Sequence, residues 1–282
     1  MSRIVYVNGV YVPEEEAKVS IFDRAFLFGD AVYEVTAVLG GRLVDFDGHL
    51  ARLDRSLKEI GLDARITHEG LREIHAELIA TNKVDEGIVY LEISRGSADR
   101  DFAFPESAEP TIVAFTQSRA LVDTPYADQG VKVVTIPDIR WKRRDIKSTS
   151  MLGQVMGKQA AKLAGAYEGW MVEDGVVTEG TSSTAFILDA DGVLRTQPLG
   201  PHILHGVTRR AVLRLARQES VRIAERPFTV EEAYQAREAF LTAASAFVLP
   251  VIEIDGHKIG GGTPGPVGRA FRQLYIEEAR KS

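Results

Sequence analysis

Three Asp-Gly pairs divide the second half of this chain into short apolar segments. They stand at Asp174-Gly175, Asp191-Gly192 and Asp255-Gly256, between runs rich in β-branched and aromatic residues. Asp-Gly supplies the backbone angles of a tight hairpin, so these runs are predicted to be short strands. Many short strands with few helices favour a partly closed, barrel-like domain.

The first half has a different pattern. Asn8-Gly9 and Gly40-Gly41 each lie between apolar runs and predict two hairpins. Leucines spaced three to four residues apart from Leu50 predict a helix capped by Asp47, and a second helix follows around Leu71–Leu78. With strands expected over 87–96 and 110–117, this half is predicted to be a small α/β unit.

Between the two patterns, residues 119–130 show no periodicity and combine Pro125 with polar residues. This composition predicts an interdomain linker. We therefore expect an α+β protein with an N-terminal domain over 1–118 and a barrel-like C-terminal domain over 131–282.

Composition excludes several classes of function. The 282 residues are 45% hydrophobic, which is enough for a sizeable core, and the formal net charge of −6 argues against a nucleic-acid-binding surface. There is no cysteine, and the six histidines lack metal-ligand spacing, so we expect no metal site. No apolar run reaches the length of a membrane span, and no leader is evident, so we expect a cytoplasmic protein without membrane partners.

A basic cluster is the first candidate site. Arg140, Arg143 and Arg144 precede Lys147, which lies between a predicted strand and a helix that Ser150 can cap. The cluster can be a solvated loop or a nucleic-acid patch. Alternatively, Lys147 is a reactive amine that a rigid scaffold directs into a cleft, as enzymes that attack carbonyl groups require.

Two further segments have a structural and a functional interpretation. Gly206, Val207 and Thr208 open a predicted helix, whose free N–H groups either receive a simple cap or bind an anion. Glu179 to Ser183 place a carboxylate and three hydroxyls between two strands. They form either a hydrogen-bonded turn or a site that holds a polar ring.

Taken together, five segments resemble the class IV aminotransferases, which are fold-type IV pyridoxal-phosphate enzymes. The segments are "FGDAVYEV", "GHLARL", "DIRWKRRDIKSTSMLG", "VTEGTSSTAF" and "LHGVTR", and they occur in the family's order over nearly the whole chain. Within the family they are most similar to the bacterial D-amino-acid aminotransferases.

This resemblance implies a role for each candidate. Lys147 would bind pyridoxal 5′-phosphate covalently and carry the proton between the substrate α-carbon and the cofactor. Glu179 would face the pyridine nitrogen and keep it protonated. The remaining cofactor contacts are implied for Arg52, Leu204, Val207, Thr208, Ser183 and Ala244. We further expect Arg140 to hold the phosphate side, with Arg143 and Arg144 in ion pairs elsewhere, because alternate strand residues point to opposite sides.

Substrate binding is implied for Tyr33, Arg100 and Phe102. Arg100 falls where the D-amino-acid enzymes place the arginine of an Arg-x-His carboxylate site, but Phe102 replaces the histidine. Ala243 and Ala244 replace hydroxyl residues near the phosphate, which predicts weaker cofactor retention because hydrogen bonds to a charged group are lost.

The resemblance thus implies a homodimeric transaminase that moves the amino group of a D-amino acid to a 2-oxo acid, such as 2-oxoglutarate or pyruvate, by a ping-pong mechanism. The family's cofactor lies between the domains, and its site is closed by the neighbouring subunit. Phe102 and the alanine pair leave an (R)-selective amine transaminase open. A branched-chain L-amino-acid transaminase, an aminodeoxychorismate lyase and a non-catalytic pyridoxal-phosphate carrier also stay open.

Overall fold

The computed structural model describes residues 2–281, which divide into two compact units. The first unit contains residues up to 120 together with 146–150, and the second contains 121–145 and 151–281. This differs from the expected division in two respects. The second unit includes most of the expected linker, where α4 (Pro125–Gln129) forms. Lys147 groups with the first unit, because its segment pairs with a strand there.

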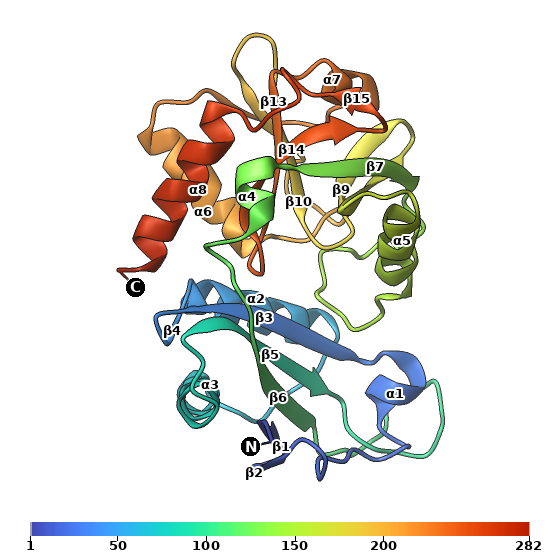
Figure 1. Ribbon diagram of the computed structural model, residues 1–282. Helices are drawn as coiled ribbons and strands as arrows, with labels where there is room; N and C mark the ends of the chain where they lie inside the picture. Colours follow the sequence, from blue (N-terminus) through green and yellow to red (C-terminus); the bar gives the residue numbers. More distant parts are fainter. Residues whose placement is uncertain (1, 282) are drawn as a thin grey trace. The chain divides into compact units, whose positions relative to one another are not determined.

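The first unit is built on a six-stranded sheet in the order β2-β1-β6-β5-β3-β4, with every neighbouring pair antiparallel (Figure 1). The first predicted hairpin is confirmed, with φ of 47° at Asn8 and 93° at Gly9, the left-handed angles that this pair tolerates. The strands are β1 (Ile4–Val7), β2 (Val10–Pro13), β3 (Ala31–Leu39), β4 (Arg42–Leu43), β5 (Glu86–Ser94) and β6 (Thr111–Ser118).

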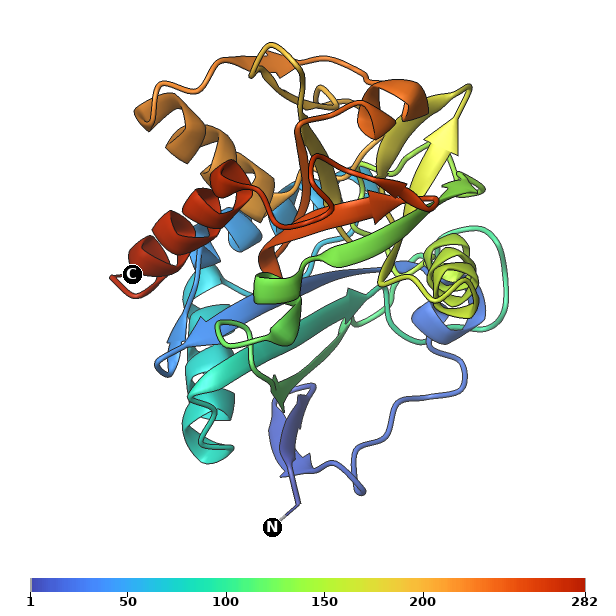
Figure 2. The same ribbon diagram turned by 45° about the horizontal axis from the view of Figure 1, so that its top comes forward.

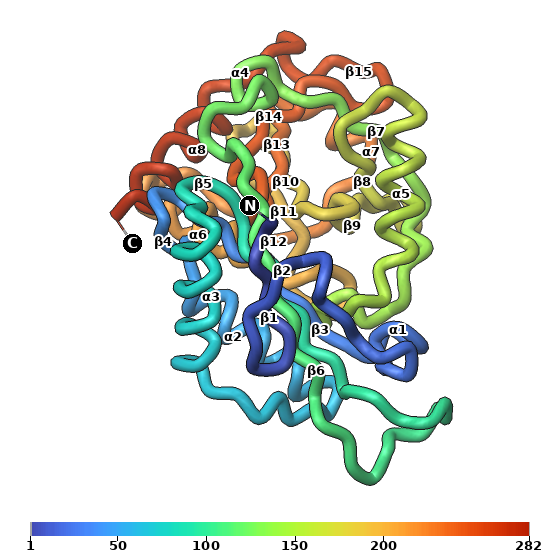
Figure 3. The backbone as a smooth tube through the Cα atoms, turned by 60° about the horizontal axis from the view of Figure 1, so that its bottom comes forward, coloured from blue at the N-terminus to red at the C-terminus, as the bar shows by residue number. Residues whose placement is uncertain are grey.

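Two helices pack their apolar faces against this sheet. They are α2 (Phe46–Glu59) and α3 (His68–Thr81), and both can be followed in Figure 3. Their leucines join strand residues such as Val32 in one core, as the periodicity predicts. The expected cap at Asp47 is wrong, because α2 begins at Phe46 and Asp47 lies inside its first turn. The short α1 (Arg24–Phe28) precedes β3.

The second unit contains a nine-stranded sheet that mixes parallel and antiparallel pairs. Its order is β12-β11-β10-β13-β14-β7-β8-β9, with β15 paired to β14. The strands are β7 (Val131–Pro137), β8 (Glu168–Glu173), β9 (Val176–Gly180), β10 (Thr184–Leu188), β11 (Leu194–Thr196), β12 (Ile223–Glu225), β13 (Glu238–Ala243), β14 (Phe247–Ile254) and β15 (His257–Lys258). Side chains of several of these strands, including Trp170 and Leu249, form its core.

Besides α4, this sheet is accompanied by α5 (Leu152–Leu163), α6 (Val207–Gln218), α7 (Val230–Tyr234) and α8 (Pro266–Ala279). Figures 1 and 2 show α6 and α8 side by side, and both contact β13. The capping box from Thr229 to Glu232 is confirmed. Ser150 does not cap α5, because Met151 is the N-cap residue and the Ser150 hydroxyl donates to the Gly29 carbonyl instead.

Candidate active site

Lys147 is held beside Tyr33 by backbone pairing in the first unit. The Tyr33 N–H donates to the Lys147 carbonyl over 3.0 Å, and the Thr149 N–H donates to the Ala31 carbonyl over 3.0 Å. The segment 146–150 therefore runs along the start of β3. The half-buried Lys147 places its Nζ 4.0 Å from the centre of the Tyr33 ring. Backbone hydrogen bonds and an isolated bridge between Val32 and Ser148 therefore hold the lysine segment against β3.

Arg52 lies in a buried ion-pair cluster with Glu34 and His49. Its Nε and Nη2 donate to the Glu34 carboxylate over 2.8 and 2.6 Å, and His49 Nδ1 lies 2.7 Å from the same group. Burial opposes ionisation of Glu34, but Arg52 and His49 outweigh it and lower its pKa to about 2. Burial lowers the pKa of His49, which accordingly favours the neutral ring. The position of Arg52 off the leucine face of α2 is explained by this cluster.

Glu34 and His49 were not identified from the sequence. His49 and Arg52 are three residues apart on α2, so they share one face of the helix, and this spacing was the available signal. Nothing in the local sequence indicated that the partner would come from β3, because that contact depends on how the helix docks on the sheet.

Substitution of Glu34 by glutamine should lower the free energy of unfolding by about 3 kcal/mol, because it removes the charge that balances buried Arg52. Glu34 has a depressed pKa in the folded state, so its contribution is present above the unfolded value and is lost as pH falls towards about 2. Urea unfolding at pH 7 and at pH 3 should therefore show a smaller difference between wild type and variant at the lower pH.

The control for this experiment is Asp47→Asn on the same helix. Its carboxylate is 91% exposed and pairs with Arg72, so less than about 1 kcal/mol should be lost. An equal effect of the two substitutions would contradict the role assigned to the Glu34 cluster.

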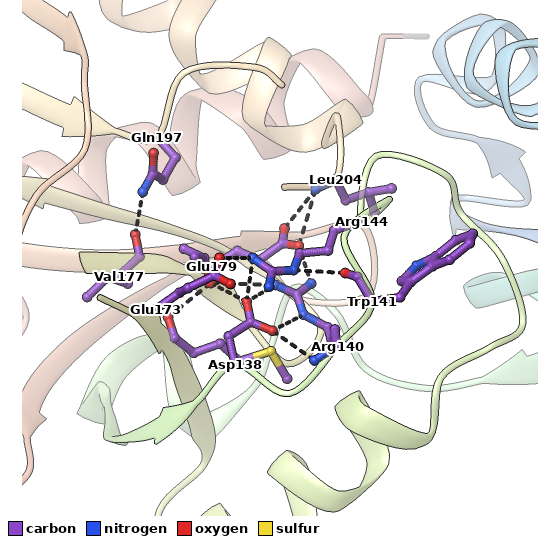
Figure 4. Close-up of polar contacts among 11 residues, drawn as sticks. Asp138, Arg140, Trp141, Arg144, Glu173, Val177, Glu179, Gln197 and Leu204 are labelled. Carbon is purple, nitrogen blue, oxygen red and sulfur yellow. Dashed lines mark hydrogen bonds and ion pairs between the residues drawn. The ribbon is translucent and has the colours of Figure 1, made fainter. Parts of the chain in front are cut away.

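In the second unit, Glu179 lies at the centre of a buried polar cluster (Figure 4). Arg140 Nη1 donates to the Glu179 carboxylate, while its Nε and Nη2 donate to Asp138 over 2.9 and 2.7 Å. The Leu204 N–H lies 3.2 Å from both carboxylate oxygens of Glu179. All three charged side chains are at most 5% exposed. The carboxylate is thus oriented from two sides.

Burial raises the pKa of Glu179, although Arg140 and the Leu204 N–H act in the opposite direction. A further positive partner would therefore stabilise the charged form of Glu179. A protonated pyridine nitrogen is such a partner. The cluster fits the ring end of pyridoxal phosphate on this ground.

The contacts of Arg140 differ from the expectation of a phosphate-side role. Its guanidinium is directed to the carboxylates of Glu179 and Asp138. The expectation of ion pairs elsewhere holds for Arg143, which pairs with Asp145. Arg144 pairs with Glu173 but also lies 3.2 Å from Asp138, so it belongs partly to the same cluster. The expectation assumed that the arginines alternate along a strand. That assumption does not apply, because β7 ends at Pro137, before these arginines.

The start of α6 offers the features of an anion site. Gly206 is its N-cap residue and provides no side-chain cap, and Val207 and Thr208 are buried in the first turn. Within residues 2–281, the hydroxyls of Thr208 and of Thr242 on the contacting strand β13 are buried without a hydrogen-bond partner. Buried hydroxyls normally have partners, so these two fit a bound phosphate. Thr242 was not identified from the sequence.

Ser183 and Ala244 are two other predicted cofactor contacts in the second unit. Ser183 donates to Glu168 over 3.3 Å, and Ser182 donates to the same carboxylate, whose pKa is raised by burial. Ala244 opens the turn between β13 and β14 and carries no hydroxyl. Any contact of Ala244 with a phosphate would therefore be made by its backbone.

Arg100 and Phe102 lie in the irregular connection between β5 and β6. The Arg100 guanidinium lies 5.4 Å from the ring centres of both Phe28 and Phe102, and the two rings are 5.5 Å apart. Phe102 is 78% exposed. The pair is therefore presented together at the surface of the first unit.

Neither a metal site nor a membrane-spanning helix is found in the described part of the chain. Among residues 2–281, no group of three or more histidine, cysteine, aspartate or glutamate residues is placed to hold a metal ion. No helix in that range has both the length and the apolar character needed to cross a membrane.

Comparison with known proteins points to one family. The model for amino-transferase class IV matches residues 31–254. A D-alanine aminotransferase of Staphylococcus aureus (strain MSSA476) is 39% identical over 279 residues, which cover 97% of this chain and 98% of that protein. A D-alanine aminotransferase of Bacillus licheniformis is 39% identical over 284 residues, covering 99% of each.

Solved structures of similar fold are branched-chain amino acid aminotransferases. The Escherichia coli enzyme has a TM-score of 0.92 at 23% identity, covering 98% of this chain and 94% of that one. A T.th. enzyme with pyridoxamine 5′-phosphate has a TM-score of 0.90 at 24% identity, covering 99% of this chain and 94% of that one. The Thermoproteus uzoniensis enzyme with norvaline has a TM-score of 0.88 at 28% identity, covering 99% of this chain and 95% of that one. At such low identity, the first two similarities concern the fold alone.

Proposed function

Because this chain belongs to the class IV aminotransferases, and is thus a pyridoxal-phosphate-dependent enzyme of fold type IV, we propose that its amino donor is a D-amino acid. The acceptor is a 2-oxo acid such as 2-oxoglutarate or pyruvate. The observation that carries this proposal is the 39% identity, over 97% of the chain, to a protein named D-alanine aminotransferase. Structural likeness to the branched-chain enzymes does not outweigh it, since one fold serves several substrates.

The residues described above would hold one cofactor in this proposal. Bound pyridoxal phosphate supplies an acceptor for the electrons that remain when the donor loses its α-proton. Glu179 favours a proton on the pyridine nitrogen, and Arg140 and the Leu204 N–H keep the carboxylate oriented for that task. The Thr208 hydroxyl and the Val207 and Thr208 N–H groups bind the phosphate. Arg52 adds positive charge there, held in place by Glu34.

Lys147 performs the proton transfer in this proposal. With pyridoxal phosphate bound, its Nζ would hold the cofactor covalently between reactions and would take up the proton released from the donor α-carbon. The Tyr33 ring, 4.0 Å from Nζ, limits the positions that the amine can occupy. We expect ping-pong kinetics, because the 2-oxo acid formed from the donor leaves before the acceptor binds.

The donor carboxylate binds to Arg100 and Tyr33. Phe102 contributes no hydrogen bond where a histidine would, so we expect weaker selection for a carboxylate and better tolerance of apolar groups. This substitution is the observation that favours an (R)-selective amine transaminase as the second candidate. We propose a homodimer, as the family resemblance implies.

The test is a comparison of kcat/KM for D-alanine, L-leucine and (R)-1-phenylethylamine with 2-oxoglutarate as the acceptor. We expect D-alanine to exceed each of the others at least about ten-fold, the ratio that a single well-placed contact supplies. A preference for L-leucine would make the enzyme a branched-chain transaminase. A preference for the amine would assign the decisive role to Phe102.

A further inference from the structure

The connection between β5 and β6 carries the proposed substrate residues but has almost no regular structure of its own. It runs over 95–110, and the backbone hydrogen bonds described for it join only its first residues, 95–98, to residues 22–30, around a bridge between Ser97 and Asp23. Arg100, Asp101 and Phe102 lie beyond that bridge. Their conformation therefore has to be maintained by side chains from elsewhere.

Arg24 provides that support. Its Nη1 donates to the carbonyls of Asp101 and Ala103 over 2.7 and 3.2 Å, and Nη2 lies 3.5 Å from the Phe102 carbonyl. One guanidinium thus contacts three consecutive backbone carbonyls. Hydrogen bonds from a charged donor are stronger than neutral ones, and the planar group fixes their directions.

Arg24 is itself held rigidly. Its Nε donates to Asp30 over 2.7 Å, and its side chain is 3% exposed. Asp30 also accepts two hydrogen bonds from Arg95, which donates in addition to the carbonyls of Ile60 and Gly61. The two arginines and one aspartate therefore link residues 101–103 to α1 and to the turn after α2.

Aromatic contacts complete the arrangement. The Arg95 guanidinium lies 3.7 Å from the centre of the Phe104 ring, and Arg24 lies 4.7 Å from that of Phe28. Phe28 is the ring on which both Arg100 and Phe102 rest. Arg24 thus fixes the backbone of residues 101–103 and also contacts the aromatic support beneath their side chains.

We infer that Arg24 is a positioning residue for the amino donor. It maintains the conformation in which Arg100 and Phe102 face the donor carboxylate, and it does so through three backbone carbonyls without contacting the donor itself. The inference rests on the proposed function of Arg100. It adds a determinant of donor affinity that lies 77 residues before Asp101 in the chain, at the start of α1.

The main test is Arg24→Gln, assayed with D-alanine and 2-oxoglutarate alongside Arg100→Gln. We expect Arg24→Gln to raise the KM for D-alanine about ten-fold while kcat changes less than about two-fold, because ground-state positioning is lost and the reacting groups are untouched. Asp30 keeps Arg95 as its partner, so the variant retains one of the two ion pairs. Its turnover of (R)-1-phenylethylamine, which has no carboxylate, should match that of wild type.

Two results would overturn the inference, and they are distinguishable. If Arg100→Gln raises the KM and Arg24→Gln does not, Arg24 has only a structural role and the proposed function stands. If neither raises the KM, the assignment of Arg100 to the donor carboxylate fails and the inference fails with it.

A second variant avoids dependence on a buried charge. Phe104 is 61% exposed, so Phe104→Leu should fold normally while losing the contact with Arg95. We expect a KM increase of about three-fold from the looser connection. The matched control is Arg65→Gln, which removes an exposed ion pair to Glu109 at the other end of the same connection and should leave the KM unchanged. Equal KM values for Phe104→Leu and wild type would contradict the inference.

Discussion

Replacement of Lys147 by alanine should lower kcat for amino transfer at least about a thousand-fold, because one substitution removes both the covalent attachment of the cofactor and the group that moves the α-proton. The Tyr33 ring that now lies 4.0 Å from the amine cannot take over either task. The measurement is kcat with D-alanine and 2-oxoglutarate on protein supplied with excess pyridoxal phosphate. The visible absorption band of the lysine-bound cofactor should also be absent.

Lys158→Ala is the matched control for this variant. Lys158 also lies over a tyrosine ring, with its Nζ 4.4 Å from the centre of Tyr167, but its side chain is 46% exposed. Its loss should change kcat less than about two-fold, since surface substitutions away from a site have small effects. A Lys147→Ala enzyme that kept a tenth of wild-type kcat would refute the role of Lys147.

Substitution of Glu179 by glutamine should lower kcat by about a hundred-fold. The amide can still accept a hydrogen bond from the Leu204 N–H, so the shape of the cluster persists, and Arg140 keeps Asp138 as its counter-charge. The amide nevertheless lacks the negative charge that favours a proton on the pyridine nitrogen, and removal of one preorganised electrostatic contact typically costs this much.

The control for this second variant is Glu173→Gln. Glu173 pairs with Arg144 at the edge of the same cluster but is 34% exposed. We expect a change in kcat of less than about two-fold. Equal losses of kcat from the two substitutions would mean that the cluster has only a structural role. They would refute the orientation of Glu179 towards the cofactor ring.

Local sequence predicted the elements of this fold well, because their determinants are local. Asn8-Gly9 adopts the left-handed angles that a tight hairpin needs, and the capping box at Thr229 forms with both of its hydrogen bonds. The ends of helices were harder to predict from the sequence. The α2 helix begins one residue after Asp45, which takes a left-handed φ of 54°.

Contacts between distant segments could not be predicted from the same patterns. The pairing of residues 146–150 with β3 joins positions more than one hundred residues apart and transfers Lys147 from the expected C-terminal domain to the first unit. Likewise, Arg140 meets Glu179, which is 39 residues later in the chain. The family resemblance predicted Lys147, Arg140 and Glu179 as site residues, but the partners of Arg140 depend on tertiary packing.

The most direct test of the central proposal is the absorption spectrum of the purified, cofactor-loaded protein during addition of D-alanine without any acceptor. We expect loss of the visible band and growth of the near-ultraviolet band of the aminated cofactor, and return of the visible band when 2-oxoglutarate is added. L-Leucine under the same conditions should change the spectrum at least about ten-fold more slowly. An unchanged spectrum with D-alanine, together with conversion by L-leucine, would contradict the assignment of a D-amino acid as the donor.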